Sequence, residues 1–329
     1  MNSQQEPKIL AVVSQDEHML EAANTGQDLY ATVAARAFHT TFEDCLEHFP
    51  KDTPIVNENN SWRYATEDEI VNGSYDKLAD GETDTYKDGK ERRKKAKVIL
   101  LGLMYGMNSK TIAEMLGCSM EEAEGIMSSV FDAFPKIKEL IAERQNFARK
   151  HKYTSTIWGR KRRLPDIALP LYEFDFSGCP DAIKNDIEWQ EENKRKWTQL
   201  LQSLKYRDRI RKKEELEKKF GLKIYFNQEK ISRAERQVLN SIIQGSAADM
   251  SKKAIVAIHQ NQELKDLGLQ MLVPIHDEIL VQCPLANAKR CKELFTYEME
   301  NCAKDKISLD IKVDPACSFA WYGDEISVK

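Results

Sequence analysis

The chain has 329 residues, of which 41% are hydrophobic and 31% are charged, a balance typical of a folded protein with about two domains. This composition excludes collagen-like and low-complexity sequence and argues against wholesale disorder. The longest apolar run, residues 98–105, is far shorter than the ~20 residues of a membrane-spanning helix, and the first residues lack the pattern of a secretion signal. We therefore expect no membrane association and a cytoplasmic location.

The cysteines bear on the redox compartment of the protein, and the charges bear on whether it binds nucleic acid. Seven scattered cysteines, without a Cys-x-x-Cys pair, favour unpaired thiols in a reducing compartment. The net charge of -4 argues against a nucleic-acid partner, because phosphate binding relies on Lys and Arg. However, residues 87–97 hold seven cations against two acids, and residues 149–163 hold seven cations and no acid. Such clustering is typical of a groove for a polyanion, although many charge runs are simply solvated.

The first predicted element is a short buried strand at residues 9–13, and residues 14–17 then provide a capping Ser and a carboxylate that open a helix. Residues 28–38 are predicted to be helical, and the polar stretch 51–89 favours short helices and loops. Helix is expected again over residues 92–107. Three further helices are marked by a terminal residue, namely Gly117 ending the first, Ser119 with Glu122 capping the second and Pro135 beginning the third.

Residues 166–231 differ in composition from the rest of the chain, because Lys, Glu and Arg crowd around a few Trp and Leu residues. The pattern predicts one or two amphipathic helices inserted into a domain, either as an inert insertion or as a binding arm. After a helix over residues 232–259, two apolar strands flank a four-residue turn and predict a hairpin. A helix over residues 286–304 and strands near residues 307–313 are expected to follow.

Three groups of residues suggest chemistry. Four side chains spaced by four residues form a stripe along one predicted helix: Arg93, Lys97, Leu101 and Tyr105. The stripe has two cations, then an apolar residue and an aromatic ring. This order suits a triphosphate at one end and a base at the other. Gly102 and Gly106 leave room beside the ring. The hairpin turn carries carboxylates that can bind hard cations, and a later helix carries groove-reading donors: His276, Asp277 and Glu278 in the turn, and Arg236, Asn240 and Gln244 on the helix.

In this order, these groups resemble the family A DNA polymerases, the DNA polymerase I type. The stripe looks like the fingers helix that binds the incoming nucleotide, and residues 156–165 resemble the segment that holds the template backbone. Residues 235–249 are similar to the palm helix that follows the primer-template minor groove. The His276-Asp277-Glu278 turn looks like the palm hairpin that carries a metal-binding aspartate. The resemblance covers most of the chain.

The resemblance implies an α+β fold. The palm would be an antiparallel sheet, built from residues 1–14 and the hairpin, with helices on one face. The fingers would be mostly helical. The implied domains are a truncated start of the palm at 1–19, fingers at 20–165, a charged, largely helical insertion at 166–231, and the palm with its catalytic hairpin at 232–329.

The resemblance also implies residue roles. Asp277 would bind magnesium, of which the complete site holds two ions, while Glu278 would be an auxiliary carboxylate and His276 would lie near the primer end. Lys97 would act as a catalytic residue and, with Arg93, bind the triphosphate. Further residues are implied for nucleotide and DNA contacts, namely Gln4, Glu6, Leu101 and Tyr105 for the dNTP, and Arg160, Arg162, Arg236, Asn240 and Gln244 for the primer-template DNA.

Two departures from the family are visible. Residues 3–8 match the second half of a family motif whose metal-binding aspartate would fall at Met1. Leu101 stands where an aromatic residue is commoner, which should alter how the sugar is sensed. The Gln-Gln-Glu-Pro sequence of residues 4–7 and the long insertion look most like those of phage or phage-derived members. This resemblance would place the protein in a bacterial host cell.

The sequence therefore predicts template-directed DNA synthesis by the C-terminal portion of a polymerase. Without the aspartate, we expect this chain alone to be weakly active or inactive. An N-terminal polymerase fragment with the exonuclease, the thumb and that aspartate would then be its partner. A misplaced gene start and a catalytically dead polymerase-like DNA-binding protein are the competing interpretations.

Overall fold

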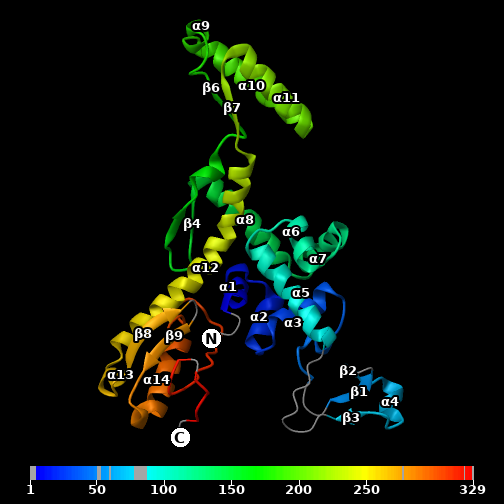
Figure 1. Ribbon diagram of the computed structural model, residues 1–329, viewed down its shortest axis with the longest axis vertical. Coiled ribbons are helices and arrows are strands. Elements are labelled where there is room, and N and C mark those ends of the chain that lie inside the picture. The colour runs from blue at the N-terminus through cyan, green and yellow to red at the C-terminus, as the bar shows by residue number, and fades with distance from the viewer. Residues whose placement is uncertain are drawn as a thin grey trace.

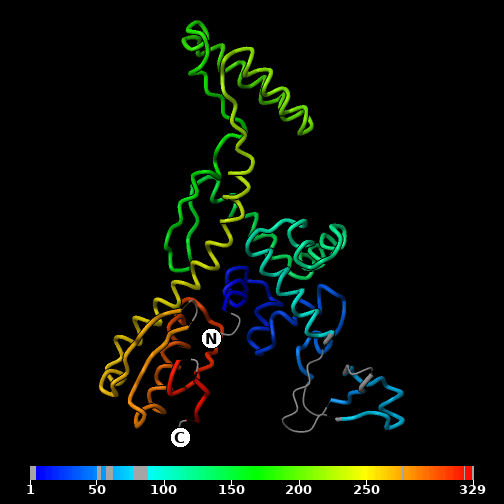
Figure 2. Tube along the Cα trace, in the orientation of Figure 1, coloured from blue at the N-terminus to red at the C-terminus, as the bar shows by residue number. Residues whose placement is uncertain are grey.

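The computed structural model describes residues 5–49, 53–58, 61–77, 87–275, 278–321 and 323–327. Within these ranges the chain is largely helical, and its strands form small antiparallel sheets. This arrangement confirms the predicted α+β class. The molecule is elongated, and helix α12 (Gln228–Gln260) runs along its long axis (Figures 1 and 2). None of the described helices is long and apolar enough to cross a membrane.

The predicted strand at residues 9–13 is wrong, because this segment lies inside helix α1 (Gln5–Ser14). Ile9, Leu10 and Ala11 are all fully buried, since α1 packs against α12, α2 (Glu17–Asn24) and α8 (Pro135–His151). A helix buried on all sides has the same short apolar run as a buried strand, so periodicity alone cannot separate them.

The caps of the next two helices are aspartates. Asp16, rather than the predicted Ser14, caps α2 by accepting a hydrogen bond from the Met19 backbone at 3.3 Å. Asp28 caps α3 (Leu29–Ala37), the helix predicted over residues 28–38, by accepting one from Ala31 at 2.9 Å. A short 3-10 turn, η1 (Glu43–Cys45), follows.

The polar stretch predicted as short helices and loops contains strands, so that prediction was largely wrong. Strands β1 (Pro54–Glu58), β2 (Ser61–Tyr64) and β3 (Asp76–Lys77) form a sheet in the order β2-β1-β3, and α4 (Glu67–Val71) is its one short helix within the described residues. Ile55 and Phe49 are buried in its small core. Only two side chains are buried in this core, with Trp62 and Tyr64 packed against them, which explains why the segment shows little periodicity.

The next four helices confirm the predictions for residues 92–150. They are α5 (Lys87–Met104), α6 (Ser109–Leu116), α7 (Met120–Ala133) and α8. Gly117 ends α6 with a φ of 68°, Ser119 accepts a hydrogen bond from Glu122 at the start of α7, and Pro135 begins α8. Together with α1, α2 and α3, these helices enclose the largest apolar core.

The middle of the chain forms two antiparallel ribbons. Strands β4 (Tyr153–Ser155) and β5 (Lys161–Arg163) pair beside α12, followed by the 3-10 turn η2 (Pro165–Ala168). Strands β6 (Tyr172–Asp175) and β7 (Lys223–Phe226) pair beyond it. Between β6 and β7 lie the helices predicted for the insertion: α9 (Asp181–Lys184), α10 (Ile187–Ser203) and α11 (Tyr206–Phe220).

The C-terminal part contains the predicted hairpin. Strands β8 (Gln270–Ile275) and β9 (Glu278–Gln282) pack on α12 and α14 (Ala288–Asn301), with α13 (Gln262–Asp266) and η3 (Leu285–Asn287) as connections. The strands predicted near residues 307–313 are wrong. Alternate residues of this segment are buried, namely Ile307, Leu309, Ile311 and Val313, but residues 307–312 form no strand.

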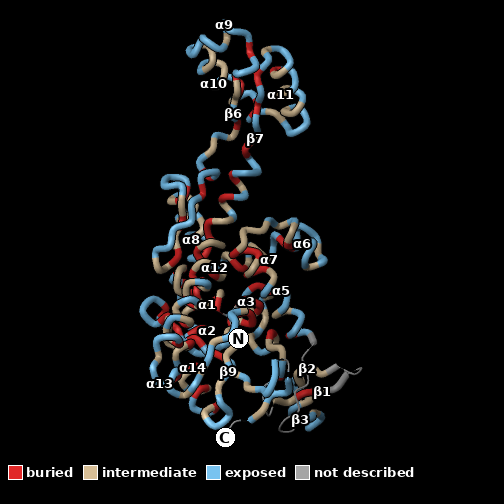
Figure 3. Tube along the Cα trace, turned by 60° about the vertical axis from the view of Figure 1, so that its left-hand side comes forward, coloured by how far each residue is buried: buried red, intermediate tan, exposed pale blue. Residues whose placement is uncertain are grey.

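Helix α12 connects these parts. Its buried side contacts α1, α8, α14, η2 and β4, and at ~1.5 Å per residue its 33 residues span about 50 Å. Buried positions follow it through the body, whereas the outer faces of α10 and α11 are largely exposed (Figure 3).

Gly106 permits a close approach between the end of α5 and α12. Its φ is 64°, and a Cβ atom there would lie 2.8 Å from Cβ and 2.9 Å from Cα of Arg236. At Gly102, a Cβ would meet Ile112 at 3.1 Å. The room beside the ring of Tyr105 is therefore filled by the protein's own packing.

We expect Gly106→Ala to lower the free energy of unfolding by about 2 to 4 kcal/mol, because Ala disfavours positive φ and would overlap Arg236. Urea unfolding measures this loss. Gly117→Ala is the matched control, since its φ is 68° but nothing lies within 4 Å. It should cost only about 1 kcal/mol. Equal losses for both variants would contradict the close approach.

Candidate active site

The predicted stripe begins with a paired cation. Arg93 on α5 donates from Nε and Nη2 to Oδ2 of Asp28, at 3.0 and 2.8 Å, and from Nη1 to Glu47 at 3.5 Å. Burial by itself would lower the pKa of Arg93, but the hydrogen bond and charge of Asp28 and the charge of Glu47 outweigh it and raise that pKa. Arg93 is thus held in a defined position as a cation.

Tyr30 of α3 lies beneath both cations of the stripe. The guanidinium carbon of Arg93 is 5.4 Å and the Nζ atom of exposed Lys97 is 5.6 Å from its ring centroid. Burial, assisted by the charge of Glu6, raises the pKa of Tyr30 to about 12. The ring is therefore neutral and offers its face to two positive charges.

The other end of the stripe joins three helices. Tyr105 directly follows α5 and donates its hydroxyl hydrogen to Glu6 of α1 at 3.1 Å, and the same hydroxyl interacts with Gln244 of α12. Burial, followed by the charge of Glu6, raises the pKa of Tyr105. Leu101 lies one turn before Tyr105 and is half-buried. The structure thus brings together residues that are widely separated in the sequence.

The predicted donors on α12 lie on its accessible side. Arg236 and Gln244 are exposed and Asn240 is half-buried. The first atoms of the Arg236 side chain pack against Gly106, at the junction of α5 and α12. One helix therefore places three hydrogen-bonding side chains beside the stripe.

The β4–β5 loop is fixed to the same helix. Arg160 donates to Asp249 at 2.7 Å and to the Gly245 carbonyl oxygen at 3.0 Å, and the Ile157 backbone donates to buried Ser246 at 3.1 Å. Arg162 is exposed on β5. The basic segment predicted to hold a template thus borders the α12 face, with Arg160 engaged and Arg162 accessible.

The hairpin is only partly described. Glu278 is the exposed first residue of β9, whereas Gln4, His276 and Asp277 lie outside the described residues. Among the described side chains, no group of three or more His, Cys, Asp or Glu is placed to hold a metal ion. The described residues therefore do not form a metal site by themselves.

Sequence reasoning missed Asp28, Tyr30 and Glu47. Asp28 carried one usable signal, its N-capping position, which uses Oδ1 and leaves Oδ2 for Arg93. Nothing in the local pattern connects Tyr30 or Glu47 with α5. The separations of 65 and 46 residues between Arg93 and its two acidic partners make these contacts tertiary.

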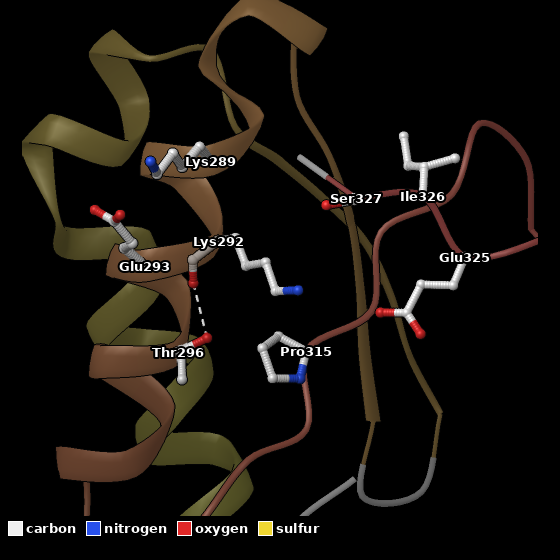
Figure 4. Close-up of a pocket in the computed structure, with 8 residues that line it drawn as sticks. All are labelled: Lys289, Lys292, Glu293, Thr296, Pro315, Glu325, Ile326 and Ser327. Carbon is white, nitrogen blue, oxygen red and sulfur yellow. Dashed lines mark hydrogen bonds between the residues drawn. The ribbon is translucent and has the colours of Figure 1, made fainter. Parts of the chain in front are cut away.

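A surface pocket lies away from all predicted site residues. It opens between α14 and the C-terminal segment, where Lys292 and Thr296 face Pro315 and Glu325 (Figure 4). The Thr296 hydroxyl donates to the Lys292 carbonyl oxygen at 2.7 Å. The pocket shares no lining residue with the stripe, the α12 donors or the hairpin turn.

Comparisons with known proteins agree with this arrangement. DNA polymerase theta of Drosophila melanogaster is 26% identical over 332 residues, which cover 99% of this chain and 11% of the relative. DNA polymerase I of Borreliella burgdorferi is 27% identical over 298 residues, 91% of this chain and 22% of the relative. The solved POL domain of Pol1 from M. smegmatis, in complex with DNA primer-template and dNTP, has a TM-score of 0.61 at 23% identity and shares the fold.

The chain spans only part of these proteins, since it covers 37% of the solved POL domain chain. The family model for "DNA polymerase family A" matches residues 77–174 and 192–323 and skips part of the insertion. That match includes the stripe, the β4–β5 loop, α12 and the hairpin. On this evidence, the chain belongs to DNA polymerase family A.

Proposed function

We propose that this chain is the fingers and C-terminal palm portion of a DNA polymerase that adds deoxynucleotides to a primer 3'-hydroxyl under the direction of a template. One observation carries the proposal: Tyr105 contacts both Glu6 and Gln244. This junction joins the helix with the proposed triphosphate-binding cations to the helix with the proposed DNA-binding donors. Family membership supports the same reaction.

The two cations of the stripe suit different tasks. Exposed Lys97 is free to bind phosphate oxygens and to donate a proton to the leaving pyrophosphate. Arg93 neutralises phosphate charge from a position that Asp28 defines, so Asp28 acts as a positioning residue. Leu101 would contact the sugar and Tyr105 the templating base. Glu6, held by the Tyr105 hydroxyl, would crowd the 2' position, with Gln4 beside the nucleotide.

DNA would lie along the accessible side of α12. Arg236, Asn240 and Gln244 are hydrogen-bonding side chains spaced by one turn, which suits contact with base edges in the minor groove. Exposed Arg162 and the adjacent Arg160 would contact the template backbone, where cations favour phosphate irrespective of sequence.

Magnesium would be held at the hairpin turn by Asp277, with Glu278 as the auxiliary carboxylate and His276 near the primer end. This ligand set rests on the resemblance, and Glu278 is its one described member. Two bound magnesium ions would supply Lewis-acid stabilisation of charge on the transferring phosphate.

The exposed surface of the hairpin also favours the proposal that the chain has a partner polypeptide. Met271, Ile279 and Val281 face the core, whereas Leu272 and Val273 remain 52% and 36% exposed. A two-stranded sheet with exposed apolar residues is marginal alone and has edges that can accept further strands. We propose that an N-terminal polymerase fragment covers this face and supplies the thumb, the exonuclease and the second metal-binding aspartate, in a phage-encoded enzyme of a bacterial cytoplasm.

Lys97→Ala should reduce primer extension by the complete polymerase about 100-fold or more, because one positioned charge stabilises the transition state by several kcal/mol. Single-turnover incorporation of one dNTP measures the rate. Lys95→Ala is the matched control, since Lys95 is also exposed on α5 but lies off the stripe. An equal rate for Lys97→Ala and Lys95→Ala would contradict the assignment.

Mixing this chain with the N-terminal fragment should give primer extension that neither part shows alone, and Asp277→Ala should abolish that gain. DNA affinity, measured by fluorescence anisotropy, should change little in Asp277→Ala. If the mixture shows no extension while the chain still binds primer-template DNA, the protein is a catalytically dead DNA-binding relative instead.

A further inference from the structure

The insertion forms a compact unit of its own, which we call the arm and define as residues 171–226. Trp197 is buried at its centre, with ring contacts to Phe174, Phe176, Trp189 and Phe220. Leu201, Leu216 and Ile224 complete this core from three different elements. The arm projects from the end of α12 (Figure 1). It is therefore a folded module rather than a loose loop.

The base of the arm holds it in a defined position. Asn227 is fully buried, donates from its side chain to the Pro170 carbonyl oxygen at 3.0 Å and donates from its backbone to Leu171 at 3.0 Å. Gly178 and Gly221 let two backbone segments approach closely, since a Cβ at Gly221 would lie 2.7 Å from the Gly178 oxygen. The Asn227 contacts join the base of the arm to the start of α12, whereas the close approach of Gly178 and Gly221 lies within the arm.

Charge is separated along the arm. Residues 173–192 carry seven acids and one Lys, whereas residues 194–213 carry nine cations and one acid. Several of these cations have acidic partners one turn away, namely Lys194, Lys196, Lys212 and Lys213. The elbow between α10 and α11 differs: within the described chain, exposed Lys205, Arg207 and Arg211 form no ion pair.

The same elbow exposes an aromatic ring. Tyr206 is 72% exposed, and Arg207 and Arg211 lie one turn apart on the adjacent stripe of α11. Arg209 points elsewhere, because its Nη2 donates to the Leu204 carbonyl oxygen and closes the elbow. Unpaired arginines match phosphate geometry, and a ring among them can stack on a base.

We propose that the elbow of the arm binds the phosphate backbone of DNA outside the catalytic cleft. The choice of DNA as partner rests on the proposed function. The family match includes the elbow and skips residues 175–191 of the arm. From Gln244 to the root of the arm at Gln228, α12 rises about 24 Å, or ~7 base pairs at 3.4 Å each. Only DNA longer than this can reach the elbow.

The test compares DNA affinity and its salt dependence for the full chain and for the variant K205Q/R207Q/R211Q, by fluorescence anisotropy. On long DNA, the variant should bind about tenfold more weakly at low salt, and the slope of log affinity against log salt should fall by about 2 to 3. The matched control K138Q/K265Q/K304Q removes three exposed cations elsewhere and should keep the slope. Thermal melting checks that both variants fold.

Three DNAs show whether the elbow contacts the duplex or the single strand. The first is a 30-base-pair duplex with a short template overhang, and the second is a 6-base-pair duplex with a 30-nucleotide overhang. The third has both a short duplex and a short overhang. The variant effect should appear with one or both long DNAs and be absent from the short one. Tyr206→Ser should weaken binding only where the single-stranded overhang is the contact. Equal slopes for the variant and the unmodified chain on both long DNAs, or an equal loss on the short DNA, would overturn the proposal. These readouts need no catalysis, so they remain decisive if primer extension fails.

Discussion

The close approach of α5 and α12 at Gly106 is the constraint on which the rest of the molecule depends. With no side chain and a positive φ, Gly106 lets Arg236 pack directly against the end of α5. The Tyr105 hydroxyl can then contact Glu6 and Gln244 at once. A larger residue would separate the two helices and, with them, the proposed nucleotide and DNA surfaces. The same packing therefore serves both the core and the site.

The two cations of the stripe differ in their electrostatic surroundings, because Arg93 is paired with acids and Lys97, within the described chain, is not. Asp28 and Glu47 neutralise much of the charge of Arg93 and keep the guanidinium in place, while Lys97 remains exposed above the Tyr30 ring. A bound triphosphate would compete with the acids for Arg93 but would meet Lys97 directly. The arrangement is suited to a ligand that must bind, react and leave.

The basic surfaces are supported in different ways. Around α12, cations such as Arg160 are anchored by acids of the same face, so that their positions are set before any ligand arrives. At the elbow of the arm, Lys205, Arg207 and Arg211 belong to a folded module and have no such partners among the described residues. Anchored cations favour defined geometry, whereas unpaired ones contribute mainly charge that salt can screen.

Local signals in the sequence determined much of the fold and the order of the site. The spacing of Arg93, Lys97 and Leu101 placed them on one helix, Gly117 ended α6, and apolar runs around a turn predicted the β8–β9 hairpin. Each of these features depends on neighbours within a few residues, so the chain reveals them without its fold. The motif order was likewise enough to indicate the family.

Only the tertiary structure decided the rest. Residues 9–13 form a helix rather than a strand because they are surrounded by other helices, and residues 307–312 remain unpaired although their burial alternates. Asp28 and Glu47 reach Arg93 across 65 and 46 residues, and Tyr105 reaches Glu6 across 99. Such contacts form only when separate elements pack together, and no local pattern of residues encodes them.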